Sequence, residues 1–228
     1  MPWTAVTTAL MGLLVAISAY AGWKAWRTST GWSRRALALG MLGLALVNAV
    51  ALVAGWRLEV ARGGSMLPSL ERFSVLWVHQ RAAIEKDLKP GDIVVFDSTW
   101  GEDGQGMPLA KRLVGRPGDH VVYRQGELWV NGHPVVNTWD SASLATFRLP
   151  GPLWKGQARL GAKPFQVLSD RGRRDHAWVD IVVPAGHCFV MGDNWGNSLD
   201  SRDMGVVDLG RIRGTVLGSW GGAEWMRP

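Results

Sequence analysis

The sequence predicts a mainly β domain carried on an anchor of two transmembrane helices. Two long apolar runs without a charged residue, separated by a short basic loop, open the chain. After residue 57 the pattern changes to short β-rich runs between Gly, Pro, Asn and Asp, and no long stretch has helical periodicity. We therefore expect a membrane anchor over residues 1–57 and an extracytoplasmic β domain over residues 58–228.

The two apolar runs predict membrane spans over about residues 4–23 and 36–56. The second run has 21 residues, and a helix of that length covers about 30 Å, one hydrocarbon thickness. A buried core helix is the alternative for either run, and a cleaved signal peptide is a further alternative for the first. A signal peptide has positive charge before its apolar run, whereas no Lys or Arg precedes Lys24 here. We therefore expect an anchor that is retained.

The loop over residues 24–35 sets the expected orientation. It contains no acidic residue and four basic ones: Lys24, Arg27, Arg34 and Arg35. Cytoplasmic loops are enriched in Lys and Arg, so we expect this loop in the cytoplasm and everything after Trp56 on the periplasmic side. The rest of the chain has 21 basic and 19 acidic residues. The high pI therefore arises largely from this loop and does not indicate a nucleic-acid partner.

Eight short runs in the rest of the chain are rich in β-formers and are separated by turn residues. They are Ser74–His79, Asp92–Phe96, Leu109–Val114, His120–Tyr123, Glu127–Val130, Phe165–Leu168, Cys188–Met191 and Gly214–Trp220. The pair Asn131-Gly132 directly after one run is a strong hairpin signal. Residues from about 138 to 164 are rich in Pro, Gly and Ser, and we expect an irregular insertion there.

Several kinds of site are excluded by missing motifs. The sequence has no Gly-x-Ser-x-Gly elbow, no His-Glu-x-x-His and no glycine-rich phosphate loop. Its five histidines lack metal-ligand spacing, and residues 193–198 fail as a calcium loop because Ser198 stands where glycine is required. The single cysteine, Cys188, cannot form an internal disulfide and is expected to be a buried apolar residue. We expect no metal and no cofactor.

Three segments remain as candidates for chemistry. In the first, Gly63 and Gly64 precede Ser65, so the backbone at this serine can approach another chain closely. In the second, Lys111 lies among apolar residues of a predicted strand. The third, residues 192–203, is a dense set of polar turn residues.

At these residues the sequence closely resembles the type I signal peptidases, a family of Ser/Lys membrane proteases. Four family motifs occur in order: Ser-Met-x-Pro at 65–68, Gly-Asp-Ile/Val at 91–94, Lys-Arg-x-x-Gly-x-Pro-Gly-Asp at 111–119 and Gly-Asp-Asn-x-x-Asn-Ser-x-Asp-Ser-Arg at 192–202. The resemblance implies a signal-peptidase-like β fold and a multi-pass protein of the bacterial inner membrane. It also implies a serine endopeptidase that removes signal peptides from secreted preproteins, cutting after small residues.

The resemblance also implies a role for each matching residue. Ser65 is expected to be the nucleophile, Lys111 its general base and Ser198 the residue that orients the lysine, while the Ser65 and Gly64 backbone N–H groups stabilise the oxyanion. Two further sets are implied: supporting ion pairs at Arg112, Asp193, Asp200 and Arg202, and a substrate pocket at Ala61, Met66, Leu70 and Ala110.

The proposed base fits simple acid–base chemistry. A serine hydroxyl needs a neighbouring base to take its proton. An exposed lysine has a pKa near about 10.4 and is almost fully protonated at neutral pH, but burial can lower that pKa by about 3–5. The apolar neighbours of Lys111 can supply this burial.

The sequence departs from the family pattern at three places. Gly63 stands where some members have a serine that supplies a second oxyanion donor. Ala110 is smaller than the usual residue, which predicts a roomier pocket for the substrate. Trp195-Gly196 replaces a pair that is usually charged, and one hypothesis is that Trp195 faces lipid.

Three other functions are alternatives to signal peptide removal. A Ser/Lys maturation peptidase with a narrow client, such as a conjugative pilin, is hard to separate by sequence. A self-cleaving Ser/Lys repressor requires a DNA-binding region and a soluble chain, which the two predicted spans oppose. A non-catalytic membrane-anchored β domain requires decayed motifs, whereas the four motifs here are intact.

Overall fold

The computed structural model describes residues 16–24, 26–28, 31–53, 55–80, 87–99, 107–142, 153–170 and 177–221. The chain divides into two compact units, residues 1–59 with 77–80 and residues 60–76 with 81–228. Every predicted site residue lies in the second unit.

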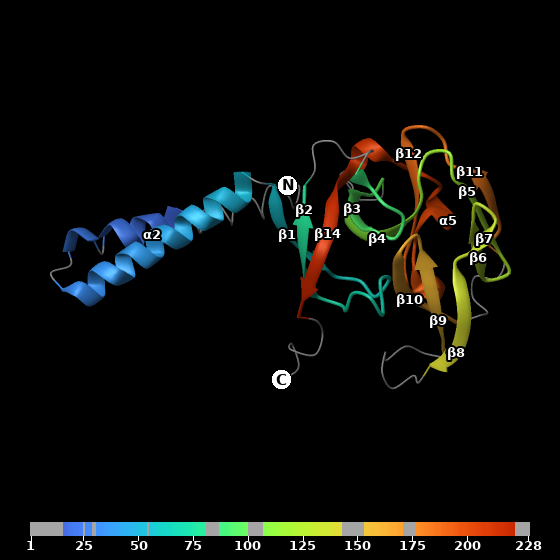
Figure 1. Cartoon of the computed structure of the whole chain (residues 1–228), viewed down its shortest axis with the longest axis horizontal. Helices are drawn as coiled ribbons and strands as arrows, with labels where there is room; N and C mark the ends of the chain where they lie inside the picture. The colour runs from blue at the N-terminus through green and yellow to red at the C-terminus, as the bar shows by residue number, and fades with distance from the viewer. Residues whose placement is uncertain are drawn as a thin grey trace. The chain divides into compact units, whose positions relative to one another are not determined.

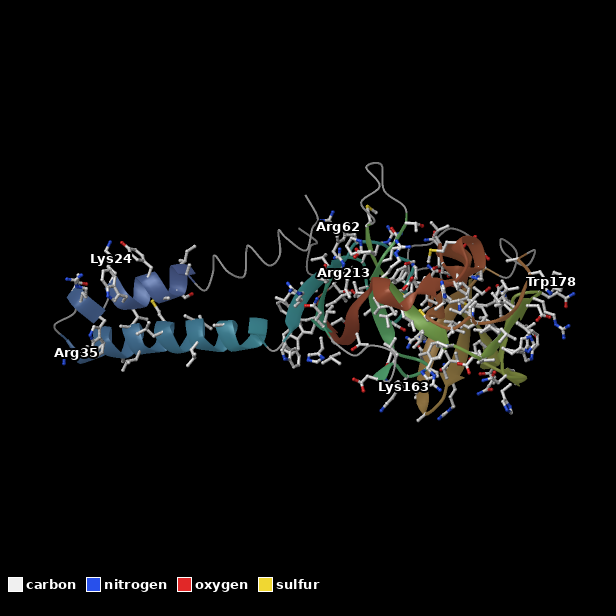
Figure 2. The ribbon with its side chains drawn as sticks, turned by 90° about the horizontal axis from the view of Figure 1, so that it is seen from above. Lys24, Arg35, Arg62, Lys163, Trp178 and Arg213 are labelled. Carbon is white, nitrogen blue, oxygen red and sulfur yellow. The ribbon has the colours of Figure 1, made fainter. Side chains whose placement is uncertain are left out.

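The first unit is largely helical. Residues 16–24 are helical, and α2 follows over Trp32–Val53 (Figure 1). Gly22 lets the two helical segments approach closely, because a Cβ there would lie 3.1 Å from the Ala38 carbonyl oxygen and the Leu42 Cγ. The basic side chains of Lys24 and Arg35 are exposed on this unit (Figure 2).

The predicted spans fall within the first unit. Residues 4–15 of the first span lie outside the described residues, and the second span overlaps α2. None of the helices in the described part of the chain combines the length and the apolar composition needed to cross a bilayer. The two-helix anchor therefore stays a prediction.

A seven-stranded sheet carries Lys111 and Arg112 of the candidate site on β4. Its strand order is β1-β2-β14-β3-β4-β12-β13 (Figure 1). In chain order these strands are β1 (Trp56–Ala61), β2 (Ser74–His79), β3 (Ile93–Asp97), β4 (Pro108–Gly115), β12 (His187–Met191), β13 (Val207–Asp208) and β14 (Ile212–Trp220).

Two smaller sheets complete the second unit. One has the order β11-β5-β6-β7 and the other the order β10-β9-β8. Their strands are β5 (His120–Arg124), β6 (Glu127–Val130), β7 (His133–Pro134), β8 (Val136–Ala142), β9 (Leu153–Leu160), β10 (Lys163–Ser169) and β11 (Val179–Val182). Short helices follow near the C-terminal end: η1 (Trp195–Asn197), α5 (Ser201–Met204) and η2 (Leu209–Arg211).

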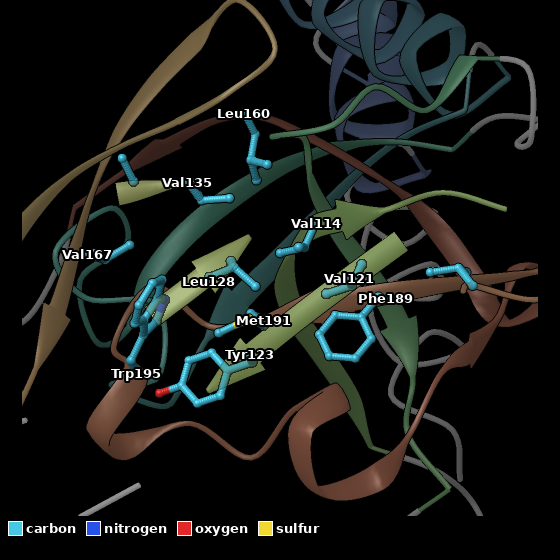
Figure 3. Packing of buried hydrophobic residues seen from close by; sticks show 12 residues of the cluster. Val114, Val121, Tyr123, Leu128, Val135, Leu160, Val167, Phe189, Met191 and Trp195 are labelled. Atoms are coloured by element: carbon cyan, nitrogen blue, oxygen red, sulfur yellow. The ribbon is translucent and has the colours of Figure 1, made fainter. Parts of the chain in front are cut away.

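Apolar residues from all three sheets form the cores. One cluster joins β5, β6, β10 and β12 with η1, and its members include Val121, Tyr123, Leu128, Val167 and Trp195 (Figure 3). The burial of these side chains is the main favourable term in the stability of the domain.

The mainly β fold predicted from the sequence is confirmed. Each of the eight predicted runs falls on a strand, with ends that differ by at most two residues. The predicted hairpin at Asn131-Gly132 is also confirmed, since β6 pairs with β7 on either side of it and both residues have positive φ, 52° and 78°.

The expected irregular insertion over about 138–164 is wrong for the part that the structure describes, while residues 143–152 lie outside the described residues. Residues 138–142 and 153–160 belong to β8 and β9, which pair with each other, and β9 also pairs with β10. Gly156 explains how this glycine-containing stretch can form a strand. A Cβ at Gly156 would lie within 2.9 Å of the Val167, Trp139 and Val136 side chains. These three side chains therefore occupy the space that a larger residue at position 156 would need.

Cys188 is a buried residue of β12, as expected, with no exposed surface. Burial, together with the nearby Asp208 carboxylate, raises the pKa of the Cys188 thiol to about 12. This thiol is therefore protonated at neutral pH and packs as an apolar group.

Candidate active site

Ser65 and Lys111 are in direct contact. Ser65 lies in the turn between β1 and β2, and Lys111 lies on β4 opposite Val94 of β3. The Lys111 Nζ is 2.5 Å from the Ser65 Oγ. Lys111 is only 2% exposed, whereas Ser65 is half-buried and lines an open cavity. A buried amine beside a partly accessible hydroxyl is an arrangement that can exchange a proton and leave the oxygen free to attack.

The segment around Ser65 is a series of tight turns. The Leu67 N–H donates to the Gly64 carbonyl at 3.3 Å, and the Leu70 N–H donates to the Met66 carbonyl at 2.9 Å. Gly64 packs against Arg72, since a Cβ at Gly64 would lie 2.9 Å from the Arg72 Nε. Within the described residues, the N–H groups of Gly64 and Ser65 donate no backbone hydrogen bond. Their role as oxyanion donors stays a prediction.

Asn194 holds this turn from the other side. Its backbone N–H donates to the Ser65 carbonyl at 3.0 Å, and its side-chain Nδ2 donates to the Gly64 carbonyl at 3.0 Å. These two bonds fix two consecutive peptide groups of the turns around Ser65, called the serine loop below. Asn194 was not among the residues expected at the site, although it lies in the last of the four motifs.

Ser198 is buried close to the serine loop. It is 2% exposed and lines the same cavity as Ser65. A Cβ at Gly192 would overlap both the Ser198 Oγ and the Ser65 carbonyl oxygen, so these three residues meet at one point. The Ser198 hydroxyl lies near the Asp200 carboxylate, whose pKa it helps to lower. Its role in orienting Lys111 stays a prediction.

Arg112 and Asp193 form a buried ion pair next to the site. The Arg112 Nε and one terminal nitrogen each donate to Asp193, at 2.7 and 2.6 Å. The guanidinium also donates to the Gly91 carbonyl at 2.6 Å and to the Ser69 Oγ at 3.2 Å. Its Cζ lies 4.0 Å from the centre of the Phe165 ring, a cation–π contact. Arg112 therefore connects β4 to four other segments of the domain.

Asp200 and Arg202 form a second buried ion pair. The Arg202 Nε and one terminal nitrogen donate to the two Asp200 oxygens, each at 2.9 Å, and both side chains are 0% exposed. Burial acts to raise the pKa of Asp200, but the Arg202 charge and the Gly192 hydrogen bond outweigh it and hold that pKa below its usual range. The pKa of Arg202 is raised in turn, because Asp200 outweighs the effect of burial.

A cavity of about 500 Å³ opens beside Ser65. Its lining consists of Gly63, Gly64, Ser65, Gly196, Asn197, Ser198 and Leu199. The four residues expected to form a substrate pocket are not part of this lining. Met66 and Leu70 are buried, at 2% and 3% exposure, and Ala61 and Ala110 are half-buried.

Trp195 does not face lipid or water. It is 2% exposed and belongs to the apolar core cluster of the domain (Figure 3). The hypothesis that it faces lipid is therefore wrong. The sequence gives no local signal for this burial, because the partners of Trp195 lie far away in the chain.

The described residues contain no group of three or more His, Cys, Asp or Glu side chains placed to hold a metal ion. The groups that meet around Ser65 are instead an amine, hydroxyls and backbone N–H donors. This set can serve acyl transfer, which requires a nucleophile, a base and donors for an oxyanion.

Comparison with known proteins gives consistent matches. The family model described as signal peptidase, peptidase S26, matches residues 32–220. A signal peptidase I of Bacillus caldolyticus is 32% identical over 177 residues, covering 74% of this chain and 84% of the relative. A signal peptidase I of Bacillus licheniformis is 32% identical over 157 residues, covering 68% of this chain and 72% of the relative. A crystal structure of a signal peptidase I from Enterococcus faecalis is 28% identical and covers 57% of this chain and 96% of the other, with a TM-score of 0.35.

Proposed function

Because the chain belongs to the signal peptidase family, peptidase S26, we propose that it removes signal peptides from secreted preproteins with a Ser65–Lys111 dyad. Membership of this family makes it a serine endopeptidase. The proposal goes further and assigns the residues, the substrate class and the side of the membrane. The observation that carries the assignment is the 2.5 Å contact between the Ser65 Oγ and the Nζ of a lysine that is 2% exposed.

In the first half of the reaction, Lys111 acts as a neutral base. Burial disfavours the charged form of an amine, which supports a neutral Lys111 that accepts the Ser65 hydroxyl proton. The Ser65 oxygen then bonds to the scissile carbonyl carbon, and the negative charge on the carbonyl oxygen is stabilised by the Ser65 and Gly64 N–H groups. The C–N bond breaks as the Lys111 ammonium returns its proton to the leaving amine, so an acyl-enzyme forms and the mature protein is released.

In the second half, the same groups act on water. Lys111 takes a proton from a water molecule as the water oxygen attacks the acyl carbon, and the ester bond to Ser65 breaks. The proton then returns to the Ser65 oxygen. Ser198 is proposed to hold the Lys111 amine in place through both halves, which its burial next to Gly192 and the serine loop supports.

The proposed location is the bacterial inner membrane, with the β domain on the periplasmic side. Support comes from the two charge-free apolar runs at about 4–23 and 36–56 and from the basic loop between them. We propose residues 1–57 as the anchor and 58–228 as the catalytic domain. The partners are then secretory preproteins and the lipid bilayer.

Substitution of the two dyad residues tests the mechanism. The full chain with Ser65→Ala or Lys111→Met is expected to lose cleavage of a purified preprotein, measured by the appearance of mature protein on a gel. Exposed residues of the same types supply the matched controls, Ser219→Ala and Lys89→Met, and both are expected to cleave at the wild-type rate. Full activity in either dyad variant would refute the mechanism.

The breadth of the client set is a separate question. A general enzyme is expected to restore growth when it is expressed in a bacterial strain depleted of its own signal peptidase. Cleavage of one pilin-type precursor without restored growth would instead indicate a narrow-client maturation peptidase. The Ser65→Ala variant is the control in both assays.

A further inference from the structure

Trp195 is enclosed by two other aromatic rings. Its ring centre lies 5.8 Å from that of Tyr123 at an interplanar angle of 77°, and 5.6 Å from that of Trp139 at 73°. Edge-to-face pairs of this kind are favourable beyond the area that they bury. Tyr123 belongs to β5 and Trp139 to β8, so the Trp195 ring contacts residues of two separate sheets.

The residue before Trp195 is the one that holds the serine loop. Asn194 donates to the carbonyls of both Gly64 and Ser65. Because consecutive backbone positions are about 3.8 Å apart, a displacement of the Trp195 backbone must also displace Asn194.

The short helix that starts at Trp195 has little support of its own. The side chain of its N-cap residue, Asn194, makes no capping hydrogen bond and is used on Gly64 instead. The turn is closed by the Asn197 N–H, which donates to the Asn194 carbonyl at 3.0 Å. Arg202 supports the turn from outside, donating to the Trp195 carbonyl at 3.0 Å and to the Tyr123 hydroxyl at 3.3 Å. The packed ring of Trp195 therefore anchors this turn together with Arg202 and the bridge between Leu168 and Asn194.

We propose that Trp195 is a positioning residue for the proposed peptidase reaction. Its ring, lodged between Tyr123 and Trp139, sets the position of the turn over residues 194–198. Through the two Asn194 hydrogen bonds, this turn fixes the orientation of Ser65 toward Lys111. The inference rests on the proposed function, because its readout is cleavage by Ser65.

The full chain with Trp195→Ala is expected to show a kcat lowered by about 100-fold, because misplacement of a reacting group by about 1 Å can cost that factor. KM for the same preprotein is expected to change less than about threefold, since the ring does not line the cavity beside Ser65. Trp195→Phe keeps an aromatic ring between the two partners and is expected to recover most of the lost kcat. All rates are measured below the unfolding temperature of each variant and divided by the folded fraction.

Leu128→Ala is the matched control. Leu128 is buried at 2% in the same core cluster, so its truncation is expected to lower Tm while the kcat of the folded enzyme stays at the wild-type value. If Trp195→Ala keeps the wild-type kcat, or if Leu128→Ala loses kcat to the same extent, the positioning role is refuted. An inactive wild-type chain would refute the proposed function before any variant is compared.

A second variant decides the matter if Trp195→Ala does not fold. Trp139→Ala removes only one of the two rings that enclose Trp195, and it is expected to lower kcat by about tenfold with KM unchanged. A wild-type kcat in folded Trp139→Ala would overturn the proposal in that case.

Discussion

At the scale of single residues, the backbone around Ser65 decides which groups can stabilise an oxyanion. The Ser65 and Gly64 N–H groups donate no backbone hydrogen bond within the described residues. Gly63, two residues before the nucleophile, has no side chain to add a hydroxyl donor. A Cβ built at Gly63 would contact only the Ser65 nitrogen, at 4.0 Å, and would otherwise point into open space. A small side chain therefore fits there without strain.

Gly63→Ser is expected to raise kcat for preprotein cleavage by about tenfold or more. The added hydroxyl would lie near the Ser65 N–H and could donate to the same oxyanion, and removal of one such donor from other proteases costs about 10²–10³ in kcat. Steady-state cleavage of a preprotein measures the change. Gly63→Ala fills the same space without a donor and is the control. Equal rates in the two variants would show that the hydroxyl does not reach the oxyanion.

At the scale of elements, the segment over residues 192–204 is the part of the fold that assembles the site. Gly192 leaves space for Ser198, Asn194 holds the serine loop and Trp195 packs into the core. Asp200 then caps α5, accepting from the Arg202 N–H, while the Asp203 side chain accepts from the Asp200 N–H. One short segment thus supplies packing, backbone bonds and a buried ion pair.

The Asp200–Arg202 pair in this segment predicts how stability depends on pH. The pKa of Asp200 is lowered in the folded state, so its ionised carboxylate stabilises the fold fully above the ordinary Asp pKa of about 3.9. That contribution is lost as the pH falls through the lower folded-state pKa. Asp200→Asn leaves a buried Arg202 without a countercharge, and we expect it to cost about 3–5 kcal/mol at neutral pH.

Denaturant unfolding of both proteins at several pH values measures this effect. The difference in the free energy of unfolding between wild type and Asp200→Asn is expected to be constant above about pH 5 and to shrink below about pH 4. Asp180→Asn, from the exposed pair with His120, is the control and is expected to change stability by at most about 0.5 kcal/mol. A difference that does not shrink at low pH would exclude the Asp200 carboxylate as its source.

The elements also show how far the sequence could predict this structure. Strands with apolar runs between clear turn pairs can be predicted, because hydrophobic periodicity, β-forming residues and flanking turn residues all indicate the same segments. β8 and β9 could not be predicted because their strand character comes from pairing with each other. In addition, Gly156 resembles a strand breaker in the sequence, whereas in the fold its missing side chain leaves room for Trp139. The contacts of Asn194 and Trp195 were missed for a related reason: their partners are more than 50 residues away in the chain.

At the scale of the whole molecule, the candidate active site is confined to one compact unit. Ser65, Lys111 and the 192–204 segment all belong to the unit formed by residues 60–76 and 81–228. The basic residues of the loop over 24–35 belong to the other unit. The distribution of charge between the units is uneven, since no acidic residue precedes Glu59.

This uneven charge predicts the orientation of the chain in a membrane. Fusions of alkaline phosphatase, which is active only outside the cytoplasm, can be made after residue 30 and after residue 57. The positive-inside rule predicts an inactive fusion at residue 30, in the basic loop, and an active fusion at residue 57, after the second apolar run. Enzyme activity is normalised to the amount of each fusion protein on an immunoblot.

Replacement of the four basic residues of the loop tests whether charge is the cause. With Lys24, Arg27, Arg34 and Arg35 all changed to Gln, the bias that holds the loop inside is removed while the two apolar runs are unchanged. The fusion at residue 57 is then expected to lose activity as part of the population inserts in the opposite orientation. An inactive fusion at residue 57 in the unaltered chain would contradict the proposed topology. Ser65 would then lie in the cytoplasm, on the side from which preproteins have not yet been exported.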